Sequence, residues 1–269
     1  MTPDATPDRT LDRKLDDKAT ELLALYTGPE LLVVVNVWDV ASATVVASAP
    51  GCRALATASH AIAATFGYPD GERISRDLML DMCGRIAAAV DLPVTADLEA
   101  GYGDPAETTR RAVAAGIAGA NLEDAMAPLA DSVAAVEAVV RAAAEAGVPF
   151  VLNARTDAFL QAGDRNRDQV LADAIERGRA YLDAGAACVF VPGLVDELTV
   201  RRLVEGIGAR RVSLLATPGT PPLSVLAGLG VARVSFGPWS QRVAMTALAD
   251  TAADLLAGGS LPDGVRPLT

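Results

Sequence analysis

Short apolar runs alternate with segments of helical periodicity along most of the chain. Each run is four or five residues long and is composed mainly of Val, Leu and Ala, as in strands that are buried on both faces. There are eight of them, at residues 31–35, 52–56, 92–96, 119–122, 150–153, 187–191, 212–215 and 231–234. Eight strands that alternate with helices predict a closed parallel (β/α)8 TIM barrel, with a doubly wound open sheet as the alternative.

The two ends of the chain differ from this regular middle. Residues 1–10 are rich in Pro, Thr and Asp and predict a disordered lead-in, whereas 11–26 predict a charged helix outside the main fold. The mostly apolar segment 243–256 predicts a C-terminal helix that is buried against a neighbouring subunit. We therefore divide the chain into a lead-in with its helix, a catalytic barrel and a tail, at residues 1–28, 29–258 and 259–269.

Composition restricts the possible partners and mechanisms. The net charge is −11 and the pI is about 4.6, which disfavours nucleic acid and anionic membranes as partners. The sequence contains no apparent signal peptide or membrane span, and Cys52, Cys83 and Cys188 lack the spacing of a metal site or a disulfide framework. These features predict a soluble cytoplasmic protein. The single histidine, His60, excludes a mechanism that needs several histidines.

The stretch after the third strand is the first candidate for chemistry. Asp97 and Glu99 are two residues apart, so both carboxylates would project to the same side of an extended chain. Asp104, Pro105 and Glu107 then predict a helix start with an aspartate N-cap, a proline at the first helical position and a capping box. Paired carboxylates suit Mg²⁺ or Mn²⁺, but a solvated acidic turn explains this spacing equally well.

Polar residues follow most of the other predicted strands too. In a barrel the carboxyl-terminal strand ends form one face, where active sites are found. The residues at these ends are Asn36, Trp38, Asp39, Thr57, Ser59, Glu123, Asp124, Asn153, Arg155, Asp157 and Thr217. Their repeated occurrence favours an enzyme over an inert barrel.

Four segments of the sequence resemble signature segments of the isocitrate lyase/phosphoenolpyruvate mutase superfamily, in particular its bacterial phosphonomutase-like branch. They are residues 67–72, 97–103, 121–124 and 153–159, and their order and spacing fit the family as well. The resemblance implies a (β/α)8 barrel, Mg²⁺ or Mn²⁺ as cofactor, and a small 2-oxo or 2-hydroxy carboxylate as substrate. It also implies a homodimer or homotetramer, often with the last helix exchanged between subunits.

The resemblance further implies roles for individual residues. Asp97 matches the carboxylate that binds Mg²⁺ most directly, and Glu99, Glu123 and Asp70 match the acids that hold its waters. Arg155 matches an arginine that contacts the substrate carboxylate and the developing oxyanion. The remaining substrate-binding positions, in addition to Asp97 and Arg155, are Trp38, Thr57, Ala58 and Ser59. A structural salt bridge from Arg155 to Asp157 or Glu123 is the alternative explanation for the arginine.

The loop after the fourth strand departs from the family pattern. Isocitrate and methylisocitrate lyases carry a Lys-Lys/Arg-Cys-Gly-His loop there, whose cysteine is the acid/base, and phosphonopyruvate-forming mutases use a lysine and an asparagine. Residues 125–132 contain no cysteine, lysine, histidine or asparagine, and the loop is also short. The remaining candidates for proton transfer are Tyr102, Glu123, Asp131, Ser132, His60 or a metal-bound water.

We therefore expect a Mg²⁺-dependent lyase that cleaves a C–C bond next to a 2-oxo or 2-hydroxy carboxylate through a metal-stabilised enolate. Arg155 and Glu123 are the expected catalytic residues. Two alternatives stay open. One is mutase or hydrolase chemistry on a phosphonopyruvate or phosphoenolpyruvate type of substrate at the same metal, and the other is a barrel that binds a carboxylate without turnover.

Overall fold

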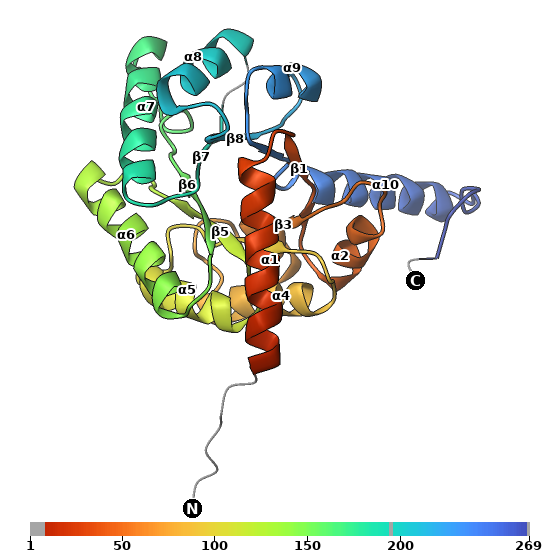
Figure 1. The fold of residues 1–269 in the computed structure, drawn as a ribbon. Helices are drawn as coiled ribbons and strands as arrows, with labels where there is room; N and C mark the ends of the chain where they lie inside the picture. The colour runs from red at the N-terminus through yellow and green to blue at the C-terminus, as the bar shows by residue number, and fades with distance from the viewer. Residues whose placement is uncertain (1–8, 194–195, 268–269) are drawn as a thin grey trace, which may run out of the picture.

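The computed structural model describes residues 9–193 and 196–267, and its strands form one parallel sheet in the order β1-β9-β8-β7-β6-β5-β4-β3-β2 (Figure 1). The strand segments are β1 (Leu32–Val34), β2 (Asn36–Val37), β3 (Leu55–Thr57), β4 (Val94–Asp97), β5 (Gly119–Glu123), β6 (Val151–Arg155), β7 (Cys188–Val191), β8 (Val212–Leu215) and β9 (Arg233–Ser235). Since β1 pairs with β9 and β2 pairs with β3, with only Val35 between β1 and β2, these two segments occupy one position of a closed barrel. The (β/α)8 prediction is confirmed and the open sheet is wrong.

Helices alternate with these strands on the outside of the barrel (Figure 1). They are α1 (Arg9–Thr27), α2 (Val40–Ala47), α3 (Ser59–Thr65), α4 (Arg76–Ala88), α5 (Pro105–Ala114), α6 (Leu129–Glu145), α7 (Arg167–Asp183), α8 (Glu197–Ile207), α9 (Leu223–Gly228) and α10 (Trp239–Leu256). Ala-Gly pairs end α5, α6 and α7, where each glycine has a positive φ that suits a residue following a helix C-cap.

Helix α1 is part of the main fold, so the prediction that it lies outside is wrong. Its Leu22 and Tyr26 are buried in one cluster with Val34, Val151 and Cys188, which belong to three strands. In Figure 1 this helix crosses in front of the strands and covers the amino-terminal end of the barrel. The leucine spacing correctly predicted that one face of this helix is buried, but it did not predict that the strands of the barrel cover that face. The domain bounds drawn from the sequence stay a prediction.

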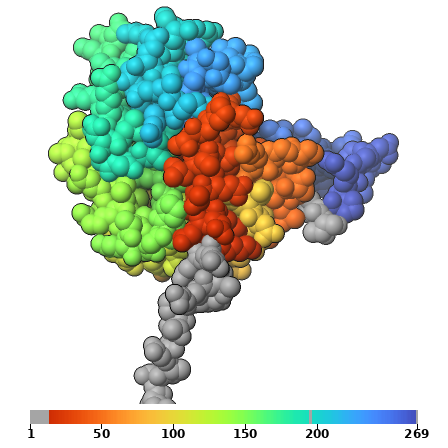
Figure 2. Space-filling model, viewed as in Figure 1, coloured from red at the N-terminus to blue at the C-terminus, as the bar shows by residue number. Residues whose placement is uncertain are grey.

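Helix α10 projects away from the barrel at the other end of the chain (Figures 1 and 2). It begins at Trp239, earlier than the predicted Val243, and none of its residues is buried. Its exposed apolar side chains include Val243, Met245 and Leu248. Among the described residues, no helix is long and apolar enough to cross a membrane.

Local boundaries differ from the predictions where turn geometry takes precedence over apolar composition. The second strand begins at Leu55, because Cys52 lies in a turn and its N–H donates to the Ala49 carbonyl. At the start of α5, Asp104 accepts from the Glu107 N–H at 3.0 Å and Pro105 is the first helical residue, as predicted. The Glu107 side chain does not reach back to complete a capping box. It pairs with Arg110 instead.

Candidate active site at the carboxyl-terminal mouth of the barrel

Asp97 ends β4 and is held by residues that end β3. Its backbone N–H donates to Thr57 Oγ1 at 2.9 Å, and its Oδ2 accepts from the backbone N–H and the Oγ of Ser59 at 3.2 and 2.8 Å. The pairing of β3 with β4 brings these positions together. The structure therefore places the predicted metal-binding carboxylate directly against the stretch predicted to bind the substrate carboxylate.

Glu99 lies just beyond Asp97, in a left-handed backbone conformation with φ of 50° rather than in extended chain. It is 2% exposed, and its carboxylate accepts from the Tyr102 hydroxyl at 2.9 Å and from the Glu72 backbone N–H. Glu72 in turn accepts from the Tyr102 N–H at 2.6 Å. The turn depends on Gly101, where φ is 92° and a Cβ would lie 2.8 Å from the ring of Pro105. The assumption that both acids project from an extended strand is therefore wrong for Glu99.

Arg155 lies between two acids at the ends of β5 and β6. Its Nη1 is 2.6 Å from Glu123 Oε2, and its Nε is 2.6 Å from Asp157 Oδ1. The Glu123 and Arg155 side chains are each 18% exposed, which leaves them partly accessible from the mouth. The salt bridges considered as the alternative role of Arg155 are thus both present. They also hold the guanidinium fork in a fixed orientation.

Negative charge accumulates around this arginine. Burial raises the pKa of Glu123 to about 8, because Arg155 offsets only part of this effect and Asp97, Asp157 and Glu99 add to it. Burial also raises the pKa of Glu99 to about 7, although its two hydrogen bonds oppose the shift. A single arginine therefore does not balance the acids at this mouth.

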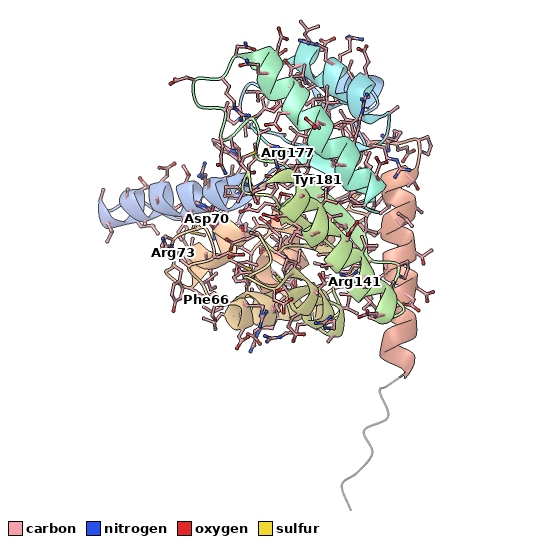
Figure 3. The ribbon with its side chains drawn as sticks, turned by 90° about the vertical axis from the view of Figure 1, so that its left-hand side faces the viewer. Phe66, Asp70, Arg73, Arg141, Arg177 and Tyr181 are labelled. Carbon is pink, nitrogen blue, oxygen red and sulfur yellow. The ribbon has the colours of Figure 1, made fainter. Side chains whose placement is uncertain are left out.

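The predicted metal ligands are near one another but do not form a ready-made site. Among the described residues, no three His, Cys, Asp or Glu side chains converge in a way that could hold a metal ion. Three of the predicted ligands have protein partners: Ser59 for Asp97, Tyr102 for Glu99 and Arg155 for Glu123. Asp70 lies in the exposed loop after α3, 3.2 Å from His60 Nδ1, and is labelled close to Arg73 in Figure 3.

Comparison with known proteins agrees with this arrangement. A family model for phosphoenolpyruvate phosphomutase matches residues 22–256. The chain belongs to this family. Its superfamily, which the sequence suggested, also contains isocitrate lyases and 2-methylisocitrate lyases, and members with these names are enzymes.

Three similar proteins illustrate the range of the family. A crystal structure described as a phosphonomutase from Burkholderia cenocepacia is 38% identical with a TM-score of 0.83, over 91% of this chain and 100% of that one. An uncharacterized protein of Mycobacterium tuberculosis is 32% identical over 87% of this chain and 88% of its own. An oxaloacetate decarboxylase of Rhodopseudomonas palustris is 31% identical over 77% of this chain and 72% of its own.

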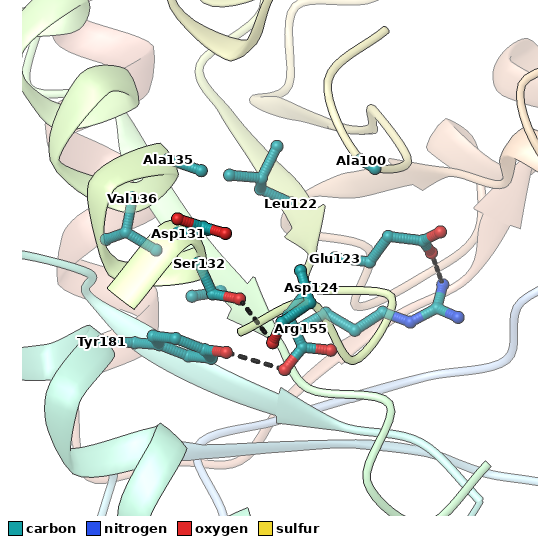
Figure 4. A pocket seen from close by; sticks show the side chains of 12 residues that line it. Ala100, Leu122, Glu123, Asp124, Asp131, Ser132, Ala135, Val136, Arg155 and Tyr181 are labelled. Atoms are coloured by element: carbon teal, nitrogen blue, oxygen red, sulfur yellow. Dashed lines mark hydrogen bonds and ion pairs between the residues drawn. The ribbon is translucent and has the colours of Figure 1, made fainter. Parts of the chain in front are cut away.

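A pocket of about 130 Å³ lies beside the acidic residues at the mouth of the barrel, between the start of α6 and the ends of β5 and β6 (Figure 4). Asp131 and Ser132 line one side, and Glu123 and Arg155 line the other. Ser132 Oγ is near the carbonyl oxygens of Ala127 and Pro128, at 3.4 and 3.3 Å. Of the proton-transfer candidates, Tyr102, Glu123, Asp131 and Ser132 line the mouth or the pocket beside it. His60 is paired with Asp70, whose charge acts on Glu99.

A buried network that the sequence did not reveal holds the short loop between β5 and α6. Asp124 accepts from the N–H groups of Met126 and Asp157, each at 3.0 Å, and from Arg177 at 3.1 Å and Tyr181 at 2.7 Å. Figure 4 shows the Tyr181 hydroxyl directed at Asp124. Arg177 and Tyr181 are four residues apart on α7, so helical spacing predicts a shared face. Nothing in the sequence links that face to Asp124.

Proposed function

We propose that the protein is a Mg²⁺-dependent lyase that cleaves a C–C bond next to a 2-oxo or 2-hydroxy carboxylate. The observation that supports this most directly is the Glu123–Arg155–Asp157 ion-pair chain beside the half-buried Asp97 and the buried Glu99. Cleavage of such a bond leaves negative charge on an enolate, and a fixed guanidinium at the mouth is suited to stabilise that charge. The similarity to an oxaloacetate decarboxylase agrees with this class of reaction.

The acids at the mouth fit a divalent cation by their chemistry. Their oxygen atoms are ligands that Mg²⁺ and Mn²⁺ prefer, and a cation would relieve the mutual repulsion that contributes to the raised pKa values of Glu99 and Glu123. We assign Asp97 as the direct ligand, with Glu99, Glu123 and Asp70 holding its waters. When bound, the cation supplies Lewis-acid polarisation of the substrate oxygens and a fixed template for orienting them.

The remaining roles fall to side chains around the acids. The exposed part of Arg155 is assigned to the substrate carboxylate and the developing oxyanion, while Glu123 and Asp157 keep its fork in place. Glu123 is assigned to proton transfer, because its carboxylate lines the pocket beside the mouth and is partly accessible. Thr57, Ala58 and Ser59 are assigned to the substrate carboxylate, since Ala58 provides no side-chain cap to the first N–H groups of α3. The half-buried Trp38 is assigned to the pocket wall.

A panel of substrates followed by proton and phosphorus NMR tests the proposal. It contains 2-oxo acids, 2-hydroxy di- and tricarboxylates and phosphonopyruvate, each with and without Mg²⁺. We expect a pyruvate-like or glyoxylate-like product that requires metal, disappears in Asp97→Asn and persists in Asp81→Asn, which changes an exposed acid of α4. If oxalate stabilises the protein with metal but no substrate is consumed, the barrel is a binder and the lyase assignment fails.

Chemistry on a C–P bond is the second candidate, favoured by the similarity to the protein described as a phosphonomutase. It uses the same enolate stabilisation by Arg155, so the site alone does not decide between the two. Conversion of phosphonopyruvate in the same panel would appear as a new phosphorus resonance. That result would replace the C–C assignment while leaving the roles of Asp97 and Arg155 intact.

We also propose a homodimer or homotetramer that forms through α10. The support is the exposure of Val243, Leu248 and Leu256, at 69%, 62% and 90%, on a helix that has no buried residue. Light scattering should show that Leu248→Glu lowers the molar mass in solution. The same change at the equally exposed Leu198 of α8 should not. A wild-type protein that is already monomeric would contradict the proposal.

A further inference from the structure

The interior of the barrel contains an unusual group of buried polar atoms without partners. Six side-chain atoms of the described residues are buried and make no hydrogen bond, and five of them belong to residues of the barrel strands or of the helix that covers its end. They are Tyr26 Oη, Thr95 Oγ1, Asn153 Oδ1, Arg233 Nε and Arg233 Nη2. The Tyr26 and Thr95 hydroxyls lie next to each other, since burial raises the pKa of Tyr26 and the Thr95 side chain partly opposes this shift. Four of the five can donate hydrogen bonds, and only Asn153 Oδ1 is restricted to accepting them.

Arg233 is the centre of this group. It is 0% exposed, and its Nη1 donates to the hydroxyls of Ser213 at 3.0 Å and Ser235 at 3.1 Å. Ser213 also lies 3.3 Å from Asn153 Nδ2, which joins Arg233 to the interior side chains of β6. The ring of Phe190 is 5.8 Å from the guanidinium carbon. Within the described residues, the hydrogen-bond partners of this arginine are neutral, and two of its three guanidinium nitrogens have none.

The two weakly acidic groups close to Arg233, the Tyr26 hydroxyl and the Cys188 thiol, cannot supply its counter-charge. Burial raises the pKa of Tyr26 to about 12 and that of Cys188 to about 12, and in each case the Arg233 charge opposes the shift only in part. The same effects show that both groups lie within electrostatic reach of Arg233. Both are neutral near pH 7, whereas a guanidinium stays charged at any ordinary pH. An unbalanced buried charge is strongly unfavourable, so the interior calls for a negative partner.

We propose that the barrel interior binds a small monovalent anion of the chloride class, held by Arg233 Nε and Nη2 and by the hydroxyls of Tyr26 and Thr95. One buried positive charge is matched by one negative charge, and the hydroxyls can rotate to donate to it. Helix α1 encloses the ion, since Tyr26 is 1% exposed and lies in the cluster that seals this end. The site is separate from the acidic mouth and is independent of the proposed reaction.

Thermal unfolding after refolding in defined salts tests the site, because refolding removes an ion that was trapped earlier. At constant ionic strength, replacing gluconate by chloride should raise the melting midpoint of wild type by about 2–5 °C for each tenfold rise above the dissociation constant. Arg233→Met should lose this response and should melt no lower than wild type in gluconate. Tyr26→Phe, which removes one donor and keeps the ring, should weaken the response.

Arg210→Met provides the matched control. Arg210 also has a buried unpartnered Nε, but its fork donates to the carbonyl oxygens of Val231 and Glu30 and it is partly exposed. Its removal should leave the chloride response intact. A wild-type midpoint that is the same in chloride and gluconate would overturn the proposal, whether or not Arg233→Met folds.

A crystal of protein refolded in bromide gives the direct observation. We expect an anomalous bromide peak within hydrogen-bond distance of Arg233 Nε or Nη2 in wild type, a weaker peak in Tyr26→Phe and no peak in Arg233→Met. If the electron density beside Arg233 shows only ordered water and no anomalous signal, the anion proposal is wrong and the guanidinium is hydrated instead.

Discussion

Two arginines of the barrel are in opposite electrostatic situations. Arg155, at the carboxyl-terminal mouth, has carboxylates 2.6 Å away on two sides. Arg233, near the covered end, has two serine hydroxyls and an aromatic ring as its neighbours. The mouth thus has more negative than positive charge, and the interior below it has the reverse.

Each end of the barrel therefore lacks the sign of charge that the other end has in excess. The surplus of carboxylates at the mouth favours a cation, and the unpaired guanidinium in the interior favours an anion. Arg233 does not neutralise the acids of the mouth, because the strand register places Ser213, and not an acid, beside it.

Removing the arginine of the mouth should have the largest effect. Arg155→Met takes away the group assigned to the developing oxyanion, and we expect kcat to fall by about 10²–10³-fold. Arg155→Lys should recover only part, because an ammonium lacks the planar fork that faces Glu123 and Asp157. Steady-state kinetics on the substrate found in the panel measure both, with Arg85→Met, an exposed arginine of α4, as control. Unchanged kcat in Arg155→Met would remove this residue from the mechanism.

The pH dependence of stabilisation by Mg²⁺ should show a smaller effect at the acids of the mouth. Because the folded protein raises the pKa of Glu99 to about 7 and of Glu123 to about 8, it holds their protons more tightly than the unfolded chain does. Without divalent metal, this contribution to stability is therefore fully present below their ordinary value of 4.5 and is lost as pH rises toward 8, by up to about 1.4 kcal/mol per pH unit for each group.

Mg²⁺ prefers the ionised acids, so its stabilising effect should be larger at about pH 8 than at about pH 6. Melting midpoints with Mg²⁺ and with a chelator measure this difference. Glu123→Gln should flatten the dependence, and the exposed Asp81→Asn should leave it as in wild type. Equal stabilisation by Mg²⁺ at both pH values would mean that these acids do not hold the cation.

Asp124 differs from both Arg155 and Arg233, because it is a buried charge whose carboxylate accepts hydrogen bonds from four donors. Tyr181→Phe removes one of them while Arg177 and two N–H groups remain, so we expect unfolding free energy to fall by about 1–2 kcal/mol. Urea unfolding measures this, with Tyr68→Phe as the control, since Tyr68 is 43% exposed. A loss as small as that of the control would show that the tyrosine contributes no net stability there.

Much of the architecture could be predicted because it depends on local patterns. The apolar runs located every strand position, and Asp104 with Pro105 fixed the start of α5. The positions of Asp97, Glu123 and Arg155 followed from the rule that parallel strands end on one face. Glu99 was harder, because its conformation depends on hydrogen bonds to Glu72 and Tyr102 in two different turns.

The rest depends on contacts between distant parts of the chain. Asp124 meets Arg177 and Tyr181 across 53 and 57 residues, and no periodicity reports such a distance. The same holds for α1, whose apolar face was visible although its partner was not. Arg233 gave no signal either, because one charged residue in a predicted strand does not reveal whether it points inward or outward.

Closure of the barrel at β1 and β9 has a consequence for how the protein is made. Leu32 pairs with Arg233, so the first strand to leave the ribosome has no partner on that side until the last strand has been synthesised. A nascent chain that ends before β9 exposes the edges of β1 and β8, which β9 finally joins. We conclude that barrel closure occurs after translation of the last strand, which makes the unfinished chain the stage most open to aggregation and to capture by chaperones.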